Sequence, residues 1–165
     1  QQLYTNSMIE QPDGHLRFYS MDYDVEHYAA ESPERVETNV TAVAHTLRRD
    51  GFVYLEPRGG YGTFATRNLI PQNAQLTINM YAPNGFVWMQ ASDARYQPID
   101  GFSFDDFIPL SGDNTAAVPQ WKNGKSAADL LGNWARLQFK LFQAQIYAID
   151  WDFHIQYGDP VIERI

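Results

Sequence analysis

The chain has 165 residues, enough for one ordinary domain with an appendage, and its 44% hydrophobic and 15% aromatic content disfavours a disordered chain. Its net charge of -8 argues against nucleic-acid backbones and anionic membranes as partners, and no apolar run is long enough to span a bilayer. Because the sequence contains no cysteine, disulfides and thiolate metal sites are excluded.

The N-terminal part, residues 1–46, is expected to form a β-hairpin extension. Its polar start ends in a turn signal, QPDG at residues 11–14. Two predicted strands follow, His15–Val25 and Val40–Thr46, with an acidic loop between them. Asn39 opens the single N-glycosylation sequon of the chain, and both glycosylation of Asn39 and a chance triplet are left open.

The middle of the chain predicts a hairpin. Residues 75–81 and 86–91 both alternate apolar and polar side chains, and APNG at residues 82–85 favours a tight turn between them. Shorter strands are predicted at residues 52–55 and 63–66, on either side of a glycine-rich link.

The last part of the chain predicts a loop and then a second hairpin. The loop, residues 98–112, holds three phenylalanines that look buried, and Ser126 is placed to cap one helical turn. Two alternating runs follow, with Leu137, Phe139, Leu141 and then Tyr147, Ile149, Trp151 as their apolar positions. Because QAQ at residues 143–145 has the character of a polar turn, the two runs predict an antiparallel hairpin on a half-buried sheet.

Many short strands with turn signals at even spacing are typical of an all-β protein. We therefore expect a two-sheet antiparallel β-sandwich of jelly-roll type over residues 47–165, preceded by the N-terminal β-hairpin extension.

An ordered set of short motifs runs through this predicted sandwich, from about Leu47 to Trp151. The motifs are LRRDGFV at 47–53, PIDGFS at 98–103, SGD at 111–113, WKNG at 121–124, DLLG at 129–132, RLQF at 136–139 and IYA at 146–148. Together they resemble the C-terminal β-sandwich module of secreted bacterial proteins related to the five-bladed β-propeller glycosidases, such as those that cleave fructans. Residues 15–46 resemble the closing strands of the preceding propeller.

The resemblance implies an extracellular or secreted module that packs beside a propeller. It transfers no catalytic residue, because in that family the catalytic carboxylates lie on the propeller and nothing in this chain matches their motifs. We therefore expect a non-catalytic carbohydrate-binding or structural module. One alternative is the C-terminal fragment or subunit of a glycoside hydrolase-like propeller protein. Another is a protein that assembles with copies of itself through exposed strand edges.

The candidate ligand site is an aromatic group on the outer face of the middle hairpin. If Leu76, Ile78, Met80, Val87 and Met89 face the core, the alternate residues face outward. Rings suit the apolar C–H face of a sugar, and amides suit its hydroxyls. The predicted carbohydrate-binding residues are Tyr81, Phe86, Trp88, Asn79 and Gln90. The competing interpretation is that a loop, the N-terminal segment or another subunit covers these rings.

Other polar groups are interpreted as solvated. The acid pairs Asp22/Asp24/Glu26 and Asp150/Asp152 have the spacing of a shared strand face but no other sign of a glycosidase pair. No cofactor is expected, and the calcium alternative is the group Asp113, Asp150 and Asp152. The four histidines, His15, His27, His45 and His154, lack the spacing of a zinc site.

Overall fold

The structure is a computed structural model that describes residues 8–23 and 40–155. Contacts between residues divide the chain into two compact units, Gln1–Gly51 and Phe52–Ile165. The division falls a few residues beyond the boundary expected between residues 46 and 47, so residues 47–51 belong to the first unit.

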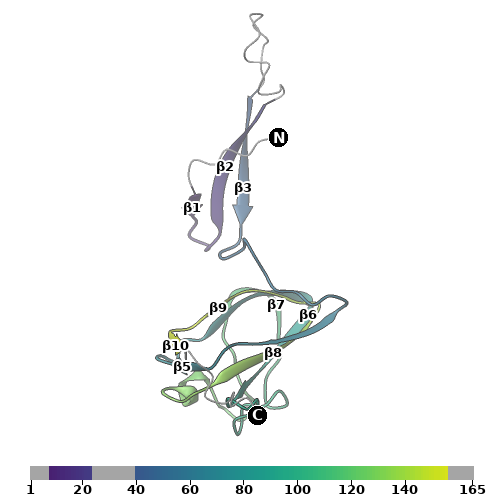
Figure 1. The fold of residues 1–165 in the computed structure, drawn as a ribbon. Helices are drawn as coiled ribbons and strands as arrows, with labels where there is room; N and C mark the ends of the chain where they lie inside the picture. Colours follow the sequence, from purple (N-terminus) through teal and green to yellow (C-terminus); the bar gives the residue numbers. More distant parts are fainter. Residues whose placement is uncertain (1–7, 24–39, 156–165) are drawn as a thin grey trace, which may run out of the picture. The chain divides into compact units, whose positions relative to one another are not determined.

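The first unit is a three-stranded antiparallel sheet in the order β1-β2-β3 (Figure 1). Its strands are β1 (Met8–Glu10), β2 (Leu16–Tyr23) and β3 (Val40–Leu47). The β2–β3 pair confirms the predicted hairpin extension, to which the structure adds the short strand β1. The predicted turn at residues 11–14 joins β1 to β2, and Gly14 adopts the positive φ of 79° that the turn requires.

On one face of this small sheet, side chains of β2 contact His45 of β3. The Ser20 hydroxyl lies 2.7 Å from Nε2 of His45, and the Phe18 ring stacks on the His45 ring with centroids 5.1 Å apart. Tyr19 and Met21 lie on the other face and are about half exposed, because none of the described residues of this unit forms a second layer over it.

The regular secondary structure of the second unit is almost entirely β-strand, as expected for an all-β sandwich. Its strands are β4 (Tyr61–Ala65), β5 (Leu69–Pro71), β6 (Thr77–Ser92), β7 (Leu110–Ala117), β8 (Arg136–Phe142), β9 (Gln145–Asp150) and β10 (Phe153–Ile155). A five-stranded sheet has the order β4-β8-β6-β7 with β9 also paired to β6, and β5 pairs with β10 in a second sheet. All pairs are antiparallel and the sheets do not close into a barrel, which confirms the predicted fold class.

The predicted middle hairpin is wrong. Residues 77–92 form one continuous strand, β6, and its two halves do not pair with each other. Thr77–Tyr81 pairs with β9, and Phe86–Ser92 pairs with β8. The APNG segment, residues 82–85, lies inside β6 and does not reverse the chain. At this segment the pairing of β6 with β7 is irregular, and its register shifts between Ala82 and Val87.

The predicted C-terminal hairpin is wrong for the same reason. β8 and β9 do not pair with each other but run one after the other along β6, so they act as a single long strand with a break at Gln143 and Ala144. Gln143 has a φ of 45°, and the chain continues forward instead of reversing. The break changes which residues face inward: Leu141 is buried, and beyond the break Ala144 and Ile146 are buried while Tyr147 is only half-buried.

Gly85 allows β6 to pass close to the β8–β9 connection at the point where the regular pairing of these strands is interrupted. A Cβ at this position would lie 2.5 Å from the carbonyl oxygen of Gln143, and closer still to that of Phe142, so only glycine lets the two backbones approach. On the neighbouring strand the amide of Gln143 donates to the carbonyl of Gly60 at 3.0 Å. The irregularities of three adjacent segments therefore line up at one level across the sheet, and we call this level the bend because such irregularities bend a strand.

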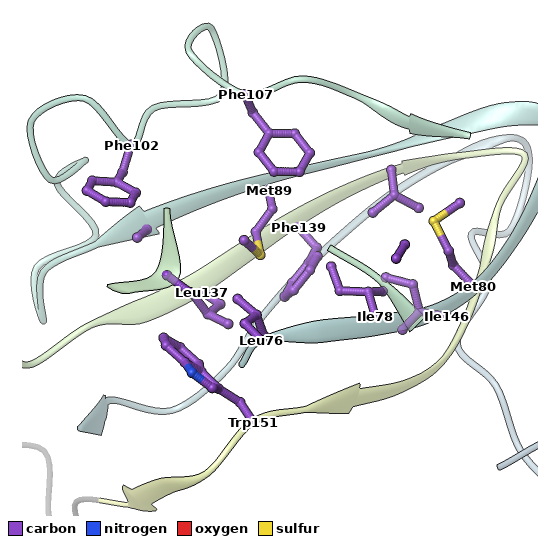
Figure 2. Packing of buried hydrophobic residues seen from close by; sticks show 14 of the residues in the cluster. Leu76, Ile78, Met80, Met89, Phe102, Phe107, Leu137, Phe139, Ile146 and Trp151 are labelled. Carbon is purple, nitrogen blue, oxygen red and sulfur yellow. The ribbon is translucent and has the colours of Figure 1, made fainter. Parts of the chain in front are cut away.

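The core lies on the inner face of the five-stranded sheet (Figure 2). Its fully buried large side chains include Leu76, Ile78, Met80, Val87, Met89, Leu137, Phe139, Phe102 and Phe107. The inward positions predicted for residues 76–80 and 87–91 are therefore confirmed, although the hairpin is not. Burying each such side chain contributes about 1.5–3 kcal/mol.

The loop after β6 completes the core from one side. Phe102 and Phe107 pack edge-on against the buried Trp121, with ring centroids 4.8 and 5.4 Å apart. Two of the three phenylalanines that looked buried are buried, and Phe104 lies half-exposed on the outside. The predicted helical turn is confirmed as a 3-10 turn, Ala127–Leu130, with Ser126 as its N-cap.

The segment predicted as a strand at residues 52–55 forms only a single bridge, between Leu55 and Ile146. Within the described ranges, no helix has the length and apolar character needed to cross a membrane.

Candidate functional site

The candidate site lies on the outer face of the five-stranded sheet, where β4, β8 and β6 are neighbours. Cross-strand pairing places Tyr61, Phe142 and Phe86 in one row. The next row of this face holds Thr63, Lys140 and Trp88. Because alternate residues of a strand share a face, the aromatic residues of these two rows are neighbours on a single surface.

Four rings on this surface contact one another, and we call them the aromatic platform: Tyr61, Phe86, Trp88 and Phe142. The Phe86 and Trp88 rings have centroids 5.5 Å apart, and those of Tyr61 and Phe142 are 5.4 Å apart. The Tyr61 and Trp88 rings are near-parallel, with an angle of 17° between planes and centroids 6.5 Å apart.

The platform is open to solvent. Tyr61 is 59% exposed and Phe86 is 42% exposed, while Trp88 and Phe142 are half-buried between their neighbours. Large rings that remain this exposed while touching one another form a contiguous apolar patch, which marks interaction surfaces on soluble proteins.

A cation lies beside the rings. Lys140 is the direct cross-strand neighbour of Trp88, and its Nζ lies 4.1 Å from the centroid of the Phe104 ring. Phe104 comes from the loop after β6, so this loop fixes the lysine ammonium at the border of the platform by a cation–π contact.

The predicted polar contacts are not available to a ligand. Asn79 is 3% exposed and Gln90 is 7% exposed, although both lie on the outer side of β6. The loop covers Gln90, whose Oε1 accepts a hydrogen bond of 3.3 Å from the backbone amide of Phe104. The competing interpretation was that the rings are covered; the loop covers Gln90, whereas Phe86 is exposed and Trp88 is half-buried.

Tyr81 is exposed but lies on the other side of the bend from Phe86. Its cross-strand neighbours are Gln145 on β9 and Asp113 on β7. The structure thus brings together two of the five predicted residues, Phe86 and Trp88, and places Tyr81 in a separate group.

Tyr61 and Phe142 complete the platform, and sequence reasoning missed both. Tyr61 lies within the glycine-rich link, for which no strand is predicted, and Phe142 directly precedes the predicted turn at residues 143–145. Phe142 shares a strand face with the polar residues Lys140 and Gln138, and this spacing was a usable signal for an outward ring. The ring partners of Phe142 depend on the neighbouring strand, which the sequence does not identify.

The described residues contain no group of three or more acidic or histidine side chains that could hold a metal ion. Asp113, Asp150 and Asp152 are therefore not gathered into a calcium site. Asp24, Glu26, His27 and Asn39 lie outside the described residues, as does the side chain of Asp22.

Among the residues that the structure describes, two carboxylates have lowered pKa values, and each accepts a hydrogen bond within a turn. The backbone amide of His15, at 3.0 Å, lowers the pKa of Asp13, and the His15 ring adds to this. The backbone amide of Ser126, at 2.9 Å, lowers the pKa of Asp129, with a smaller contribution from Lys125. These shifts have a structural cause and point to no catalytic acid or base.

No protein-family model matches this sequence, and comparisons with curated proteins and with solved structures give no match.

Proposed function

We propose that the second unit is a non-catalytic carbohydrate-binding module that acts outside the cell, with the aromatic platform as its binding surface. The observation that carries the proposal is the set of four contacting rings on the outer face of the sheet, of which Tyr61 and Phe86 are exposed and Trp88 and Phe142 are half-buried. Pyranose and furanose rings present an apolar C–H face that stacks on such a surface, with hydroxyls around its edge.

Binding then combines stacking with a few polar contacts at the border. Trp88 and Phe86 take the C–H face of a sugar, and Tyr61 extends the surface toward β4. Thr63 and Lys140 lie in the same row as Trp88 and supply a hydroxyl and an ammonium group to sugar hydroxyls. They take the role first expected of Asn79 and Gln90, which are buried.

Affinity electrophoresis tests the proposal directly. The chain is run in native gels that contain inulin, levan, xylan, laminarin or soluble cellulose, and binding is measured as retardation. We expect Trp88→Ala to weaken binding at least about tenfold, equivalent to about 1.4 kcal/mol, because a central ring of the platform is removed. Trp134→Ala is the matched control, since Trp134 is an exposed tryptophan in the loop before β8.

Unchanged retardation of Trp88→Ala by a polysaccharide that retards the wild-type chain would rule out the platform as the binding surface. Thermal unfolding of both variants controls for loss of structure. An absence of retardation by every polysaccharide of the panel counts against carbohydrate binding as such.

A second candidate function is association between copies of the chain through the first unit. Its three-stranded sheet exposes Met8, Ile9, Tyr19 and Met21, which is costly for so small a sheet. Light scattering should then give a mass that rises with protein concentration, and Tyr19→Ser together with Met21→Ser should lower it. A monomeric mass over a wide concentration range contradicts this candidate. A propeller chain as the partner, which the resemblance implies, would instead appear as a second chain in native mass spectrometry of material from the source.

A further inference from the structure

A second group of rings lies on the outer face, on the other side of the bend. Tyr54 belongs to a segment that is fixed to β9 by two backbone hydrogen bonds between Leu55 and Ile146, 2.9 and 3.0 Å long. The Tyr54 and Tyr147 rings have centroids 5.5 Å apart and planes tilted by 55°. Tyr81 on β6 is the cross-strand neighbour of Gln145 on β9. We call Tyr54, Tyr81 and Tyr147 the tyrosine group.

Two polar side chains beside the tyrosine group, Gln145 and Glu56, are held in place by hydrogen bonds. The hydroxyl of Tyr147 donates to Oε1 of Gln145 at 2.7 Å, and Nε2 of Gln145 donates to Oε2 of Glu56 at 3.1 Å. The amide is therefore fixed in one orientation before any ligand arrives, which lowers the entropic cost of binding to it. Tyr54 and Tyr81 remain 48% and 41% exposed, so a ligand can reach their rings and hydroxyls.

The tyrosine group and the aromatic platform belong to the same three adjacent segments of chain. On one side of the bend, Gln145 of β9 lies between the Glu56 segment and Tyr81 of β6. On the other side, Phe142 of β8 lies between Tyr61 of β4 and Phe86 of β6. A ligand that runs along the strands meets both groups in succession, because the bend separates them by only a few residues on each segment.

We propose that the tyrosine group is a second subsite, and that the ligand is a linear, uncharged glycan chain long enough to cover both groups. This inference rests on the proposed function of the platform. The rings, phenol hydroxyls and fixed amide match repeating C–H faces and hydroxyls. The exposed Glu56 carboxylate and the net charge of -8 disfavour chains with sulfate or carboxylate groups.

Titration with oligosaccharides of increasing length tests the second subsite. The probes are the mono-, di-, tetra- and hexasaccharides of whichever neutral polysaccharide retards the chain most, measured by calorimetry. For the wild-type chain we expect the affinity for the hexasaccharide to exceed that for the disaccharide by a factor of about 5 or more, which corresponds to ~1 kcal/mol. Tyr54→Ala and Tyr81→Ala should bind the disaccharide like the wild-type chain and lose this gain.

Tyr19→Ala is the matched control, because Tyr19 is as exposed as Tyr54 but lies in the first unit. Full retention of the length-dependent gain in both tyrosine variants overturns the second subsite. So does a wild-type affinity that does not depend on length. In either case a loss of affinity at every length in Trp88→Ala still supports the platform, whereas an unchanged Trp88→Ala removes the platform itself.

Discussion

At the scale of the residue, one glycine decides the course of the sheet. Gly85 lets the Phe142–Gln143 backbone pass where any side chain would collide with it. A glycine in a turn sequence is usually explained by its access to positive φ, and that explanation produced the predicted hairpin. The glycines with positive φ lie elsewhere, for example Gly112 at 86°. Gly85 is needed for close approach of two strands, which no local sequence signal distinguishes from a turn.

Replacing Gly85 by alanine should destabilise the second unit by about 3 kcal/mol or more, because the new Cβ meets two backbone carbonyls that cannot move independently. The control is Gly112→Ala, where a Cβ has open space but the φ of 86° is unfavourable, with an expected cost of about 1–2 kcal/mol. Urea denaturation of the two variants measures the difference. Equal costs would mean that crowding at residue 85 is relieved by movement of the β8–β9 connection.

At the scale of the element, the prediction that rests on local sequence is confirmed, whereas most predicted strand pairings are wrong. The 3-10 turn, Ala127–Leu130, follows directly from its sequence, since Ser126 and Asp129 form a capping box that needs no other part of the chain. Alternation predicts the strands, but of the predicted pairings only the N-terminal hairpin, β2–β3, is confirmed. The middle and C-terminal hairpins are wrong because β6 pairs with β9 on one side of the bend and with β8 on the other.

The capping box should make stability depend on pH in a defined direction. Because the backbone amide of Ser126 lowers the pKa of Asp129 in the folded chain, the folded carboxylate binds a proton less readily than the unfolded one, whose pKa is about 3.9. Its contribution is therefore complete above that value and is lost as the pH falls through the lower folded pKa.

Asp129→Asn should accordingly be less stable than the wild-type chain at neutral pH, with a difference that shrinks as the pH falls below about 4. Denaturant unfolding at a series of pH values measures this difference. Lys125→Met serves as the control, since Lys125 lies 3.8 Å from the carboxylate and contributes less than the backbone amide. A difference that stays constant from neutral to acidic pH contradicts the assignment.

At the scale of the whole molecule, the chain combines two units of different character. The second unit has its own buried core, which extends from Leu69 to Trp151. The first unit is a three-stranded sheet with exposed apolar side chains on it. The aromatic platform, the proposed binding surface, therefore belongs to the unit that has its own core, and the exposed apolar side chains of the three-stranded sheet belong to the other unit.

The sequence alone determined the all-β class, the inward positions of β6 and β8, and the outward aromatic character of Phe86 and Trp88. These depend on alternation and composition, which act over a few residues. Only the tertiary structure decided that Tyr61 and Phe142 join those rings, that the loop with Phe104 covers Gln90, and that Tyr81 lies across a bend from Phe86. These facts depend on which strands are neighbours, and strand pairing is settled by contacts between residues far apart in the chain.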